Sequence, residues 1–220
     1  MADTRHCEQC GTEFAPRREH ARFCSARCRV AWNREHTSER AAEESALDWS
    51  VTAMRETAGR LLRMTARDRS RGFAVISEAV WWVTIVDGTL VRYHPDMYDG
   101  LLDGLPRARR RAIEETLGGL RFVRNRMGHH LDPDDLIKPA GVAESRITAW
   151  AWKPVSAPAP GSLPPRGQAW EMTRYRAYQA QLADRAVGST FERALAFLEL
   201  ATDRAKLAPA AVSVPQSVPR

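Results

Sequence analysis

The sequence predicts a mainly α-helical protein in which a helical bundle follows a small cysteine-rich module. Three observations predict this fold class. Apolar residues recur every three or four positions from Leu47 to Leu61, which is the period of one helix face. The same period runs through residues 73–93, and strand-like alternation is confined to the short stretch "RITAWAW" at 146–152.

The composition is that of an ordinary globular protein. The 220 residues, 44% of them apolar, suffice for one substantial domain and a small module. No apolar run reaches the roughly 18 residues that a membrane-spanning helix needs, and "MADTRHCEQC" lacks the features of a secretion signal. We therefore expect a cytoplasmic protein. The net charge of +6 is locally concentrated at 107–111 and 121–126, which permits RNA or DNA as a partner without requiring it.

All four cysteines fall within the first 28 residues, at Cys7, Cys10, Cys24 and Cys28. Two closely spaced thiolate pairs separated by a loop can surround one Zn²⁺ tetrahedrally, and four thiolates leave no open position for a catalytic water. We therefore predict one structural zinc ion per chain. The alternatives are a disulfide pair or a redox CxxC, and the redox motif would need a βαβ context that this segment lacks.

The residues around these cysteines predict a knuckle followed by a helix. Gly11 permits a tight turn after Cys10, and Ser25 is a good N-cap for a helix with Cys28 in its first turn. His6 and His20 are then bystanders. The segments "CEQCGTEF" and "RFCSARCR" resemble small treble-clef or ribbon zinc fingers, similar in ligand order to the bacterial gyrase-inhibitor zinc proteins. Such fingers bind nucleic acid in some proteins and protein in others.

The first elements of the body are helices. One helix begins at Ser38 and carries the Leu47 to Leu61 stripe. The segment 73–93 could be a helix or, through "WWVTIV", a strand; its apolar spacing favours a helix that ends at the "HP" of 94–95. Asp87 lies on the apolar stripe of this second helix, where we expect a hydrogen-bonded core residue, with a functional role as the alternative.

The later elements include a third helix at 106–117, which starts at a proline and ends at Gly118 and Gly119, and a fourth at 119–130. The Pro-rich stretch 138–167 is expected to be an extended connection around the bundle, broken by an edge strand at "RITAWAW". Further helices are predicted from Gln168 and from Ser189, where "STFE" is a capping box. The predicted domains are therefore a zinc finger at 1–36, a bundle at 37–206 with its 138–167 insertion, and a disordered tail at 207–220.

The stretch "GLRFVRNRMGHH" places polar chemistry beside an apolar helix face. On a helix Asn125 and His129 are i, i+4 neighbours, and Arg124 lies beside them. A guanidinium, an amide and an imidazole side by side suit cleavage of an RNA phosphodiester, because imidazole moves protons and guanidinium stabilises the phosphorane charge. The plainer interpretation is a solvated helix end with a histidine pair.

"RNRMGHH" resembles the R-x(4-6)-H motif of HEPN domains, with Arg124-x4-His129 as the match and His130 also within the allowed gap. The resemblance implies a helical bundle, often dimeric, whose members include metal-independent endoribonucleases of toxin–antitoxin and phage-defence systems. Other members only bind RNA or nucleotides. By this resemblance the catalytic residues are Arg124, Asn125 and His129, with His130 as a spare, RNA is the substrate, and an antitoxin or a second copy is a partner.

Two hypotheses follow from the sequence. In the first, the chain is a HEPN-type endoribonuclease whose zinc finger positions RNA or a partner. In the second, it is a non-catalytic zinc-finger adaptor or nucleic-acid-binding protein in which Arg124 and His129 are structural. The arrangement of Arg124 and His129, together in a cleft or separately buried, distinguishes the two.

Overall fold

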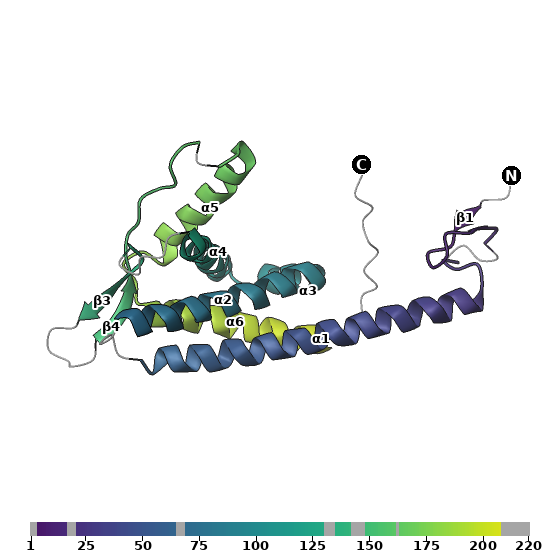
Figure 1. The fold of residues 1–220 in the computed structure, drawn as a ribbon, viewed down its shortest axis with the longest axis horizontal. Coiled ribbons are helices and arrows are strands. Elements are labelled where there is room, and N and C mark those ends of the chain that lie inside the picture. Colours follow the sequence, from purple (N-terminus) through teal and green to yellow (C-terminus); the bar gives the residue numbers. More distant parts are fainter. Residues whose placement is uncertain are drawn as a thin grey trace. The chain divides into compact units, whose positions relative to one another are not determined.

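The computed structural model describes residues 4–16, 21–64, 69–129, 135–141, 148–161 and 163–207, without the side chains of 36–44, 69, 129, 141 and 148. The elements in chain order are β1 (Arg5–His6), β2 (Glu13–Phe14), α1 (Ala26–Leu62), α2 (Arg69–Tyr93), α3 (Pro95–Asp103), α4 (Arg107–His129), β3 (Ile137–Gly141), β4 (Thr148–Trp152), α5 (Pro165–Gln181) and α6 (Val187–Leu207) (Figure 1). The predicted mainly α fold class is confirmed.

The chain divides into two compact units, Met1–Trp49 and Ser50–Arg220. Helix α1 belongs to both, because neither proline nor glycine occurs between Ala26 and Ala58 to end it. The predicted boundary between residues 36 and 37 therefore lies inside a continuous helix, and no new helix begins at Ser38. Of the predicted disordered tail, Leu207 is the last residue of α6 and residues 208–220 lie outside the described part.

The core of the second unit is built around α2, which packs against α3, α4 and α6. Its residues Ile76, Val83 and Leu90 are fully buried, as the apolar spacing predicts. Among the described residues α2 alone is long and apolar enough to cross a membrane by length and composition, and 44% of its apolar window is buried inside the protein. The apolar stripe of α2 therefore packs in the core of the bundle.

Helix α3 was not predicted, since the "HP" at 94–95 was expected only to end the preceding helix. Pro95 ends α2 but also opens α3, where its missing N–H costs nothing at the first helical position. Tyr98 and Leu102 are the buried residues of α3.

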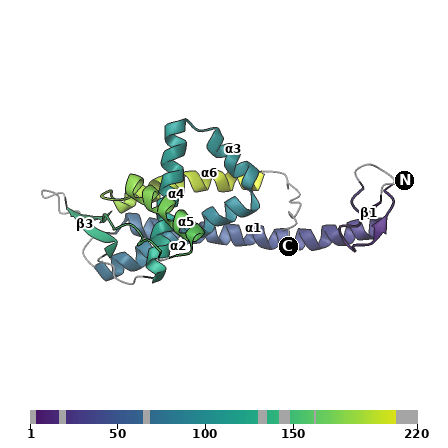
Figure 2. The ribbon, with the colours of Figure 1, turned by 90° about the horizontal axis from the view of Figure 1, so that it is seen from above.

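Helix α4 crosses α2 and α6 steeply, since it is seen end-on in Figure 1 and lengthwise in Figure 2. It is one helix, so the predicted division at Gly118 and Gly119 is wrong. The two glycines are contact points for α5. A Cβ at Gly119 would lie 2.7 Å from Leu182 Cδ1 and 3.1 Å from Tyr178 Cα, and one at Gly118 would lie 3.2 Å from Ala177 Cβ.

The Pro-rich connection contains an antiparallel hairpin. The predicted strand is β4, and β3 pairs with it from Ile137 opposite Trp152 to Gly141 opposite Thr148. Beyond β4 the chain is extended, as predicted, and is tied to α5 because Tyr178 Oη donates to the Lys153 carbonyl and Gln179 Nε2 donates to the Val155 carbonyl. The connection thus lies against α5.

Helix α6 begins at Val187, two residues before the predicted start. Ser189 is therefore inside the helix and its hydroxyl donates to the Ala186 carbonyl 2.9 Å away, so the expected capping box does not form. The preceding turn is instead held by strand β4, because the Trp152 N–H donates to Arg185 O and the Asp184 N–H donates to Trp152 O, each at 3.0 Å.

Candidate metal centre and candidate nucleic-acid interface

The first cysteine pair lies on a tight loop between β1 and β2. The Cys7 N–H donates to Thr12 O at 2.9 Å and the Gly11 N–H donates to Cys7 O at 2.8 Å. Gly11 has a φ of +71°, which a residue with a Cβ adopts only with strain. This glycine therefore permits the turn that presents Cys7 and Cys10 to one point.

The second pair is presented by the start of α1. The Cys28 N–H donates to Ser25 Oγ at 3.2 Å, which confirms Ser25 as the predicted N-cap and places Cys28 in the first turn. The exposed N–H groups and the dipole of a helix N-terminus favour a thiolate at this position.

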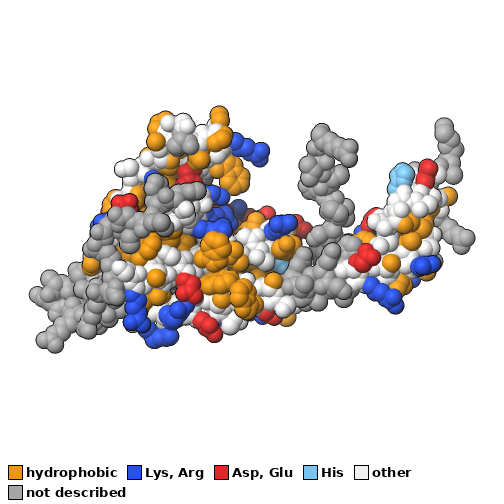
Figure 3. Space-filling view, in the orientation of Figure 1, with side chains coloured by type: hydrophobic (Ala, Val, Ile, Leu, Met, Phe, Trp, Pro, Cys, Tyr) orange, Lys and Arg blue, Asp and Glu red, His pale blue; other side chains and the backbone are white. Residues whose placement is uncertain are grey.

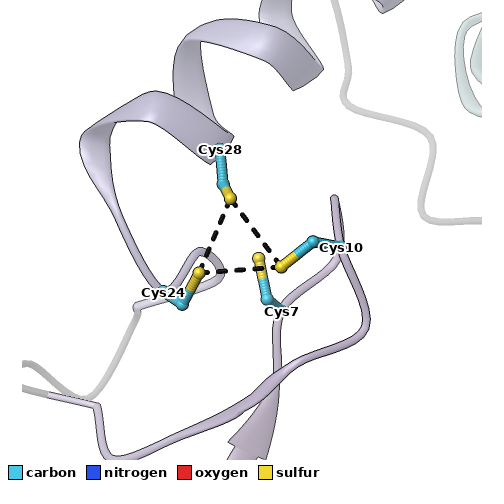
Figure 4. A group of neighbouring side chains, drawn as sticks. All are labelled: Cys7, Cys10, Cys24 and Cys28. Atoms are coloured by element: carbon cyan, nitrogen blue, oxygen red, sulfur yellow. Dashed lines mark hydrogen bonds between the residues drawn. The ribbon is translucent and has the colours of Figure 1, made fainter.

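The four sulfur atoms converge (Figure 4), and all of them lie within 4.8 Å of one another. The Cys10–Cys24, Cys24–Cys28 and Cys10–Cys28 separations are 3.7, 3.5 and 3.8 Å. Four sulfurs at the usual Zn–S distance of about 2.3 Å form a tetrahedron with edges of about 3.8 Å. The cluster therefore fits one tetrahedral metal ion with thiolate ligands only and is compatible with zinc.

The pKa values of two thiols in the cluster are shifted in opposite directions. Burial raises the pKa of Cys7, but backbone hydrogen bonds at Cys24, Cys10 and Gln9 outweigh burial and lower this pKa to about 6. Hydrogen bonds with the sulfurs of Cys28 and Cys10 raise the pKa of Cys24 to about 12.

A small set of contacts supports the cluster. Arg22 Nε donates to Glu8 Oε1 at 2.7 Å, and the Arg22 guanidinium lies 4.9 Å from the centre of the Trp32 ring. Phe23 packs on the same indole, with ring centres 5.7 Å apart. His6 Nδ1 is hydrogen-bonded to Gly11 O, as expected for a bystander, while His20 lies outside the described residues.

Three of the predicted catalytic residues, Arg124, Asn125 and His129, lie on the last turns of α4. The Arg124 guanidinium stacks over the Trp81 ring of α2, 4.6 Å from its centre, and Asn125 Nδ2 donates to Glu171 Oε2 of α5 at 3.0 Å. Helix α4 ends at His129, whose side chain lies outside the described part, as does all of His130. The structure therefore places Arg124 and Asn125 between α2 and α5 but does not test their approach to an imidazole.

Asp87 is a buried, fully hydrogen-bonded core residue, as predicted. Tyr98 Oη donates to Asp87 Oδ1 at 2.6 Å, and Arg121 Nε donates to Asp87 Oδ2 at 2.7 Å. Burial first, and then the negative charge of Asp87, raise the pKa of Tyr98 far above its usual value, so the phenol remains a donor. Arg121 is thus held by Asp87.

Two hollows lie beside the predicted catalytic residues, along the contact of α4 with α5. The smaller, of about 410 Å³, is lined by Asn125, Glu171 and Arg166 among others. The larger, of about 720 Å³, is lined by Arg111, Arg121 and Arg176 among others. Trp170 and Arg174 of α5 line both, so the hollows share one wall.

Sequence reasoning assigned Trp170 to a helix but did not identify Arg174 or Trp81 as functional candidates. The signal available was the i, i+4 spacing of Trp170 and Arg174, which puts an indole and a guanidinium on one helix face. Trp81, in the "WW" of α2, carries no comparable local signal, because its role depends on the packing of α2 against α4.

Comparison with known proteins gives no family assignment: no family model, no curated protein and no solved structure matches the chain.

Proposed function

We propose that the protein binds single-stranded RNA along α4 and α5 and cleaves it without a catalytic metal at the C-terminal end of α4. The observation that carries this proposal is the position of Arg124. Its guanidinium is held over an exposed indole, beside Asn125 and next to hollows lined by further arginines. A guanidinium held in place can stabilise the negative charge of a pentacoordinate phosphate. The imidazole is assigned to His129 by the resemblance of "RNRMGHH" to the HEPN motif.

In the proposed reaction side chains carry out the proton transfers and stabilise the charge on phosphate. His129 removes the proton of the ribose 2′-hydroxyl, the 2′-oxygen forms a bond to phosphorus, and the bond from phosphorus to the 5′-oxygen breaks with protonation of the leaving oxygen. The products are a 2′,3′-cyclic phosphate and a 5′-hydroxyl. Arg124 neutralises the non-bridging oxygens and Asn125 orients the phosphate, with His130 as the second proton-transfer group.

The four cysteines contribute structure rather than catalysis in this proposal. Their thiolates complete a zinc ion's coordination, which leaves no position for a reacting water. Free thiols clustered at a metal site suit the reducing cytoplasm, where we propose that the protein acts as a toxin or phage-defence effector, held in check by an antitoxin or another protein.

The test is incubation of the purified full-length chain with single-stranded RNA in the presence and absence of EDTA. We expect cleavage that is insensitive to brief EDTA treatment and fragments that end in 2′,3′-cyclic phosphate. His129→Ala should lower the rate at least ~10²-fold, as expected for loss of a general acid–base group. Arg124→Lys should also fail, since a point charge does not reproduce a bidentate guanidinium.

Arg204→Ala is the control, because Arg204 is an exposed arginine on α6 that lines neither hollow and belongs to neither basic cluster. This variant should cleave at the wild-type rate. Cleavage that persists in the Arg124→Ala, His129→Ala double variant would refute the proposed site.

A second function, a non-catalytic zinc-finger adaptor or nucleic-acid-binding protein, is favoured by one specific observation. Asn125 is hydrogen-bonded to Glu171, and Arg124 is packed on Trp81, so both residues have structural partners in the bundle. If this function is correct, the wild-type protein cuts no RNA while the Arg124→Ala variant loses stability.

A further inference from the structure

The two hollows between α4 and α5 share the side chains of Trp170 and Arg174, and we call the surface that they line together the groove. The proposed reaction leaves this feature of the described surface unexplained. Both volumes, about 410 and about 720 Å³, fall in the range of small-ligand sites, about 300–1,000 Å³. Asn125 lines the smaller hollow, so the groove reaches the residue next to Arg124. A chain lying in the groove would therefore arrive at the end of α4 that carries the proposed chemistry.

Trp170 is the exposed aromatic residue of this groove. It is 59% exposed, whereas Tyr178 on the same helix is fully buried. The Arg174 guanidinium lies 5.4 Å from the centre of its ring, one helical turn further on. An exposed indole with a cation beside its ring can bind a further planar group by stacking.

The charge of the groove favours an anion. Its described lining includes five arginines (Arg111, Arg121, Arg166, Arg174 and Arg176) and three glutamates (Glu114, Glu115 and Glu171). Several of these charges are already paired, such as Arg111 with Glu115 and Arg121 with Asp87.

Arg174 differs from those paired groups. Partial burial and the nearby positive charges of Arg121 and Arg124 lower its pKa, and Glu171 compensates only in part. A bound anion at Arg174 would relieve this repulsion. Arg174 is therefore the cation of the groove to which a bound anion would add the most favourable charge interaction.

We propose that Trp170 and Arg174 form a binding subsite for single-stranded RNA, in which one base stacks on the indole and an adjacent phosphate contacts the guanidinium. The subsite rests on the proposed function for the identity of its ligand. Stacking is tolerant of sequence, so the groove guides the strand toward Arg124 without selecting particular bases. An acidic peptide would satisfy Arg174 but would leave the indole face unused.

The experiment measures binding separately from cleavage. Fluorescence anisotropy is recorded with a labelled 2′-O-methyl oligouridine, which cannot be cleaved because its 2′-oxygen carries no proton. Trp170→Ala should raise Kd about 10- to 100-fold, the loss expected for one stacked base, and Trp170→Phe should recover most of it. Arg174→Ala should weaken binding and lower the slope of log K against log salt by about 0.7, the value for one phosphate on a single strand.

Two competitors and one control identify the ligand class. Inorganic polyphosphate has no bases, so its binding should respond to Arg174→Ala but not to Trp170→Ala, and a poly-glutamate peptide should compete weakly. Arg204→Ala, on α6 and outside the groove, should leave the oligouridine Kd within about twofold. Circular dichroism verifies that each variant is folded.

The outcomes separate this subsite from the cleavage reaction. Unchanged oligouridine binding in both Trp170→Ala and Arg174→Ala would overturn the subsite, even if wild-type protein cuts RNA. Polyphosphate binding that falls equally in Trp170→Ala would overturn base stacking. Binding that depends on both residues in a protein that cuts no RNA would support the subsite and refute the proposed reaction.

Discussion

Arg121 and Arg124 lie three residues apart on α4 but have different kinds of partner. Arg121 is hydrogen-bonded to Asp87, whose side chain is only 1% exposed. Arg124 lies over Trp81, which is 49% exposed. Figure 3 shows Lys and Arg side chains over α4 beside hydrophobic side chains over α2. The first arginine is therefore tied to the buried core, whereas the second lies against a half-exposed ring.

This difference predicts unequal costs of removing the two guanidinium groups. Arg121→Ala leaves the Asp87 carboxylate buried with Tyr98 as its remaining donor, and we expect a loss of about 3 kcal/mol in the free energy of unfolding. Arg124→Ala removes a stacking contact at an exposed indole and should cost under about 1 kcal/mol. Urea unfolding of both variants measures this, and equal costs would show that Asp87 does not depend on Arg121.

At the scale of the element, α4 depends on glycines to approach α5. Gly119→Ala puts a methyl group 2.7 Å from Leu182 Cδ1 and 3.1 Å from Tyr178 Cα, and the second of these atoms is backbone that cannot rotate away. Overpacking of this kind costs about 1–3 kcal/mol, so the variant should be less stable although alanine is the better helix former.

Gly88→Ala is the matched comparison, because Gly88 lies in the interior of α2 and nothing lies within 4 Å of its added Cβ. It should gain about 0.5–1 kcal/mol from helix propensity. Thermal unfolding of both variants measures whether each substitution raises or lowers the stability of the protein. A stabilised Gly119→Ala protein would mean that α5 does not pack closely on α4.

The elements that the sequence predicts well are those defined by local patterns. The stripes of α1 and α2 and the spacing of Cys7, Cys10, Cys24 and Cys28 need no knowledge of distant residues. The local sequence at Gly118 and Gly119 predicts a helix end. Helix α4 needs these glycines for the close approach of Leu182 and Tyr178, which are about 60 residues away in sequence, so no local pattern indicates their role. The groove of Trp170 and Arg174 depends on the same packing, so only its α5 half has a signal in the sequence.

At the scale of the whole molecule, the two compact units are stabilised by different means. In the described part of Met1–Trp49 the buried apolar side chains are Cys7 and Leu47, beside a stack of the half-buried Phe23 and Trp32. By contrast, Ser50–Arg220 contains nearly the whole apolar core. A module with so small a core folds when its metal binds. We therefore expect metal binding to stabilise the first unit and to leave the second unchanged.

We accordingly expect one zinc ion per chain in the purified protein, measured by elemental analysis. A strong chelator should reduce helicity at the start of α1, while the cooperative thermal unfolding of Ser50–Arg220 persists. Cys24→Ser, Cys28→Ser protein should already be in the chelated state and show no further change. A metal-free protein with an unchanged, fully folded first unit would contradict the zinc assignment.

The last prediction concerns self-association, which would bring two copies of the Arg124 end of α4 together. The surface beside Arg124 includes the exposed Trp81, and a composite site built from two chains is what the HEPN resemblance implies for a single Arg/His pair. Light scattering at micromolar concentration should give the mass of a dimer. Trp81→Ser should shift the protein toward monomer, because aromatic anchors near the centre of an interface carry much of its binding energy.

Leu200→Ser is the control for this experiment, since Leu200 on α6 is exposed to a similar extent, 44%, and has no part in the α2–α4 surface. It should remain dimeric. A strict monomer for the wild-type chain would mean that the Arg124 surface acts alone or with a different protein, which favours the adaptor function. A dimer that survives Trp81→Ser would place the contact elsewhere and leave each Arg124 surface free to bind RNA independently.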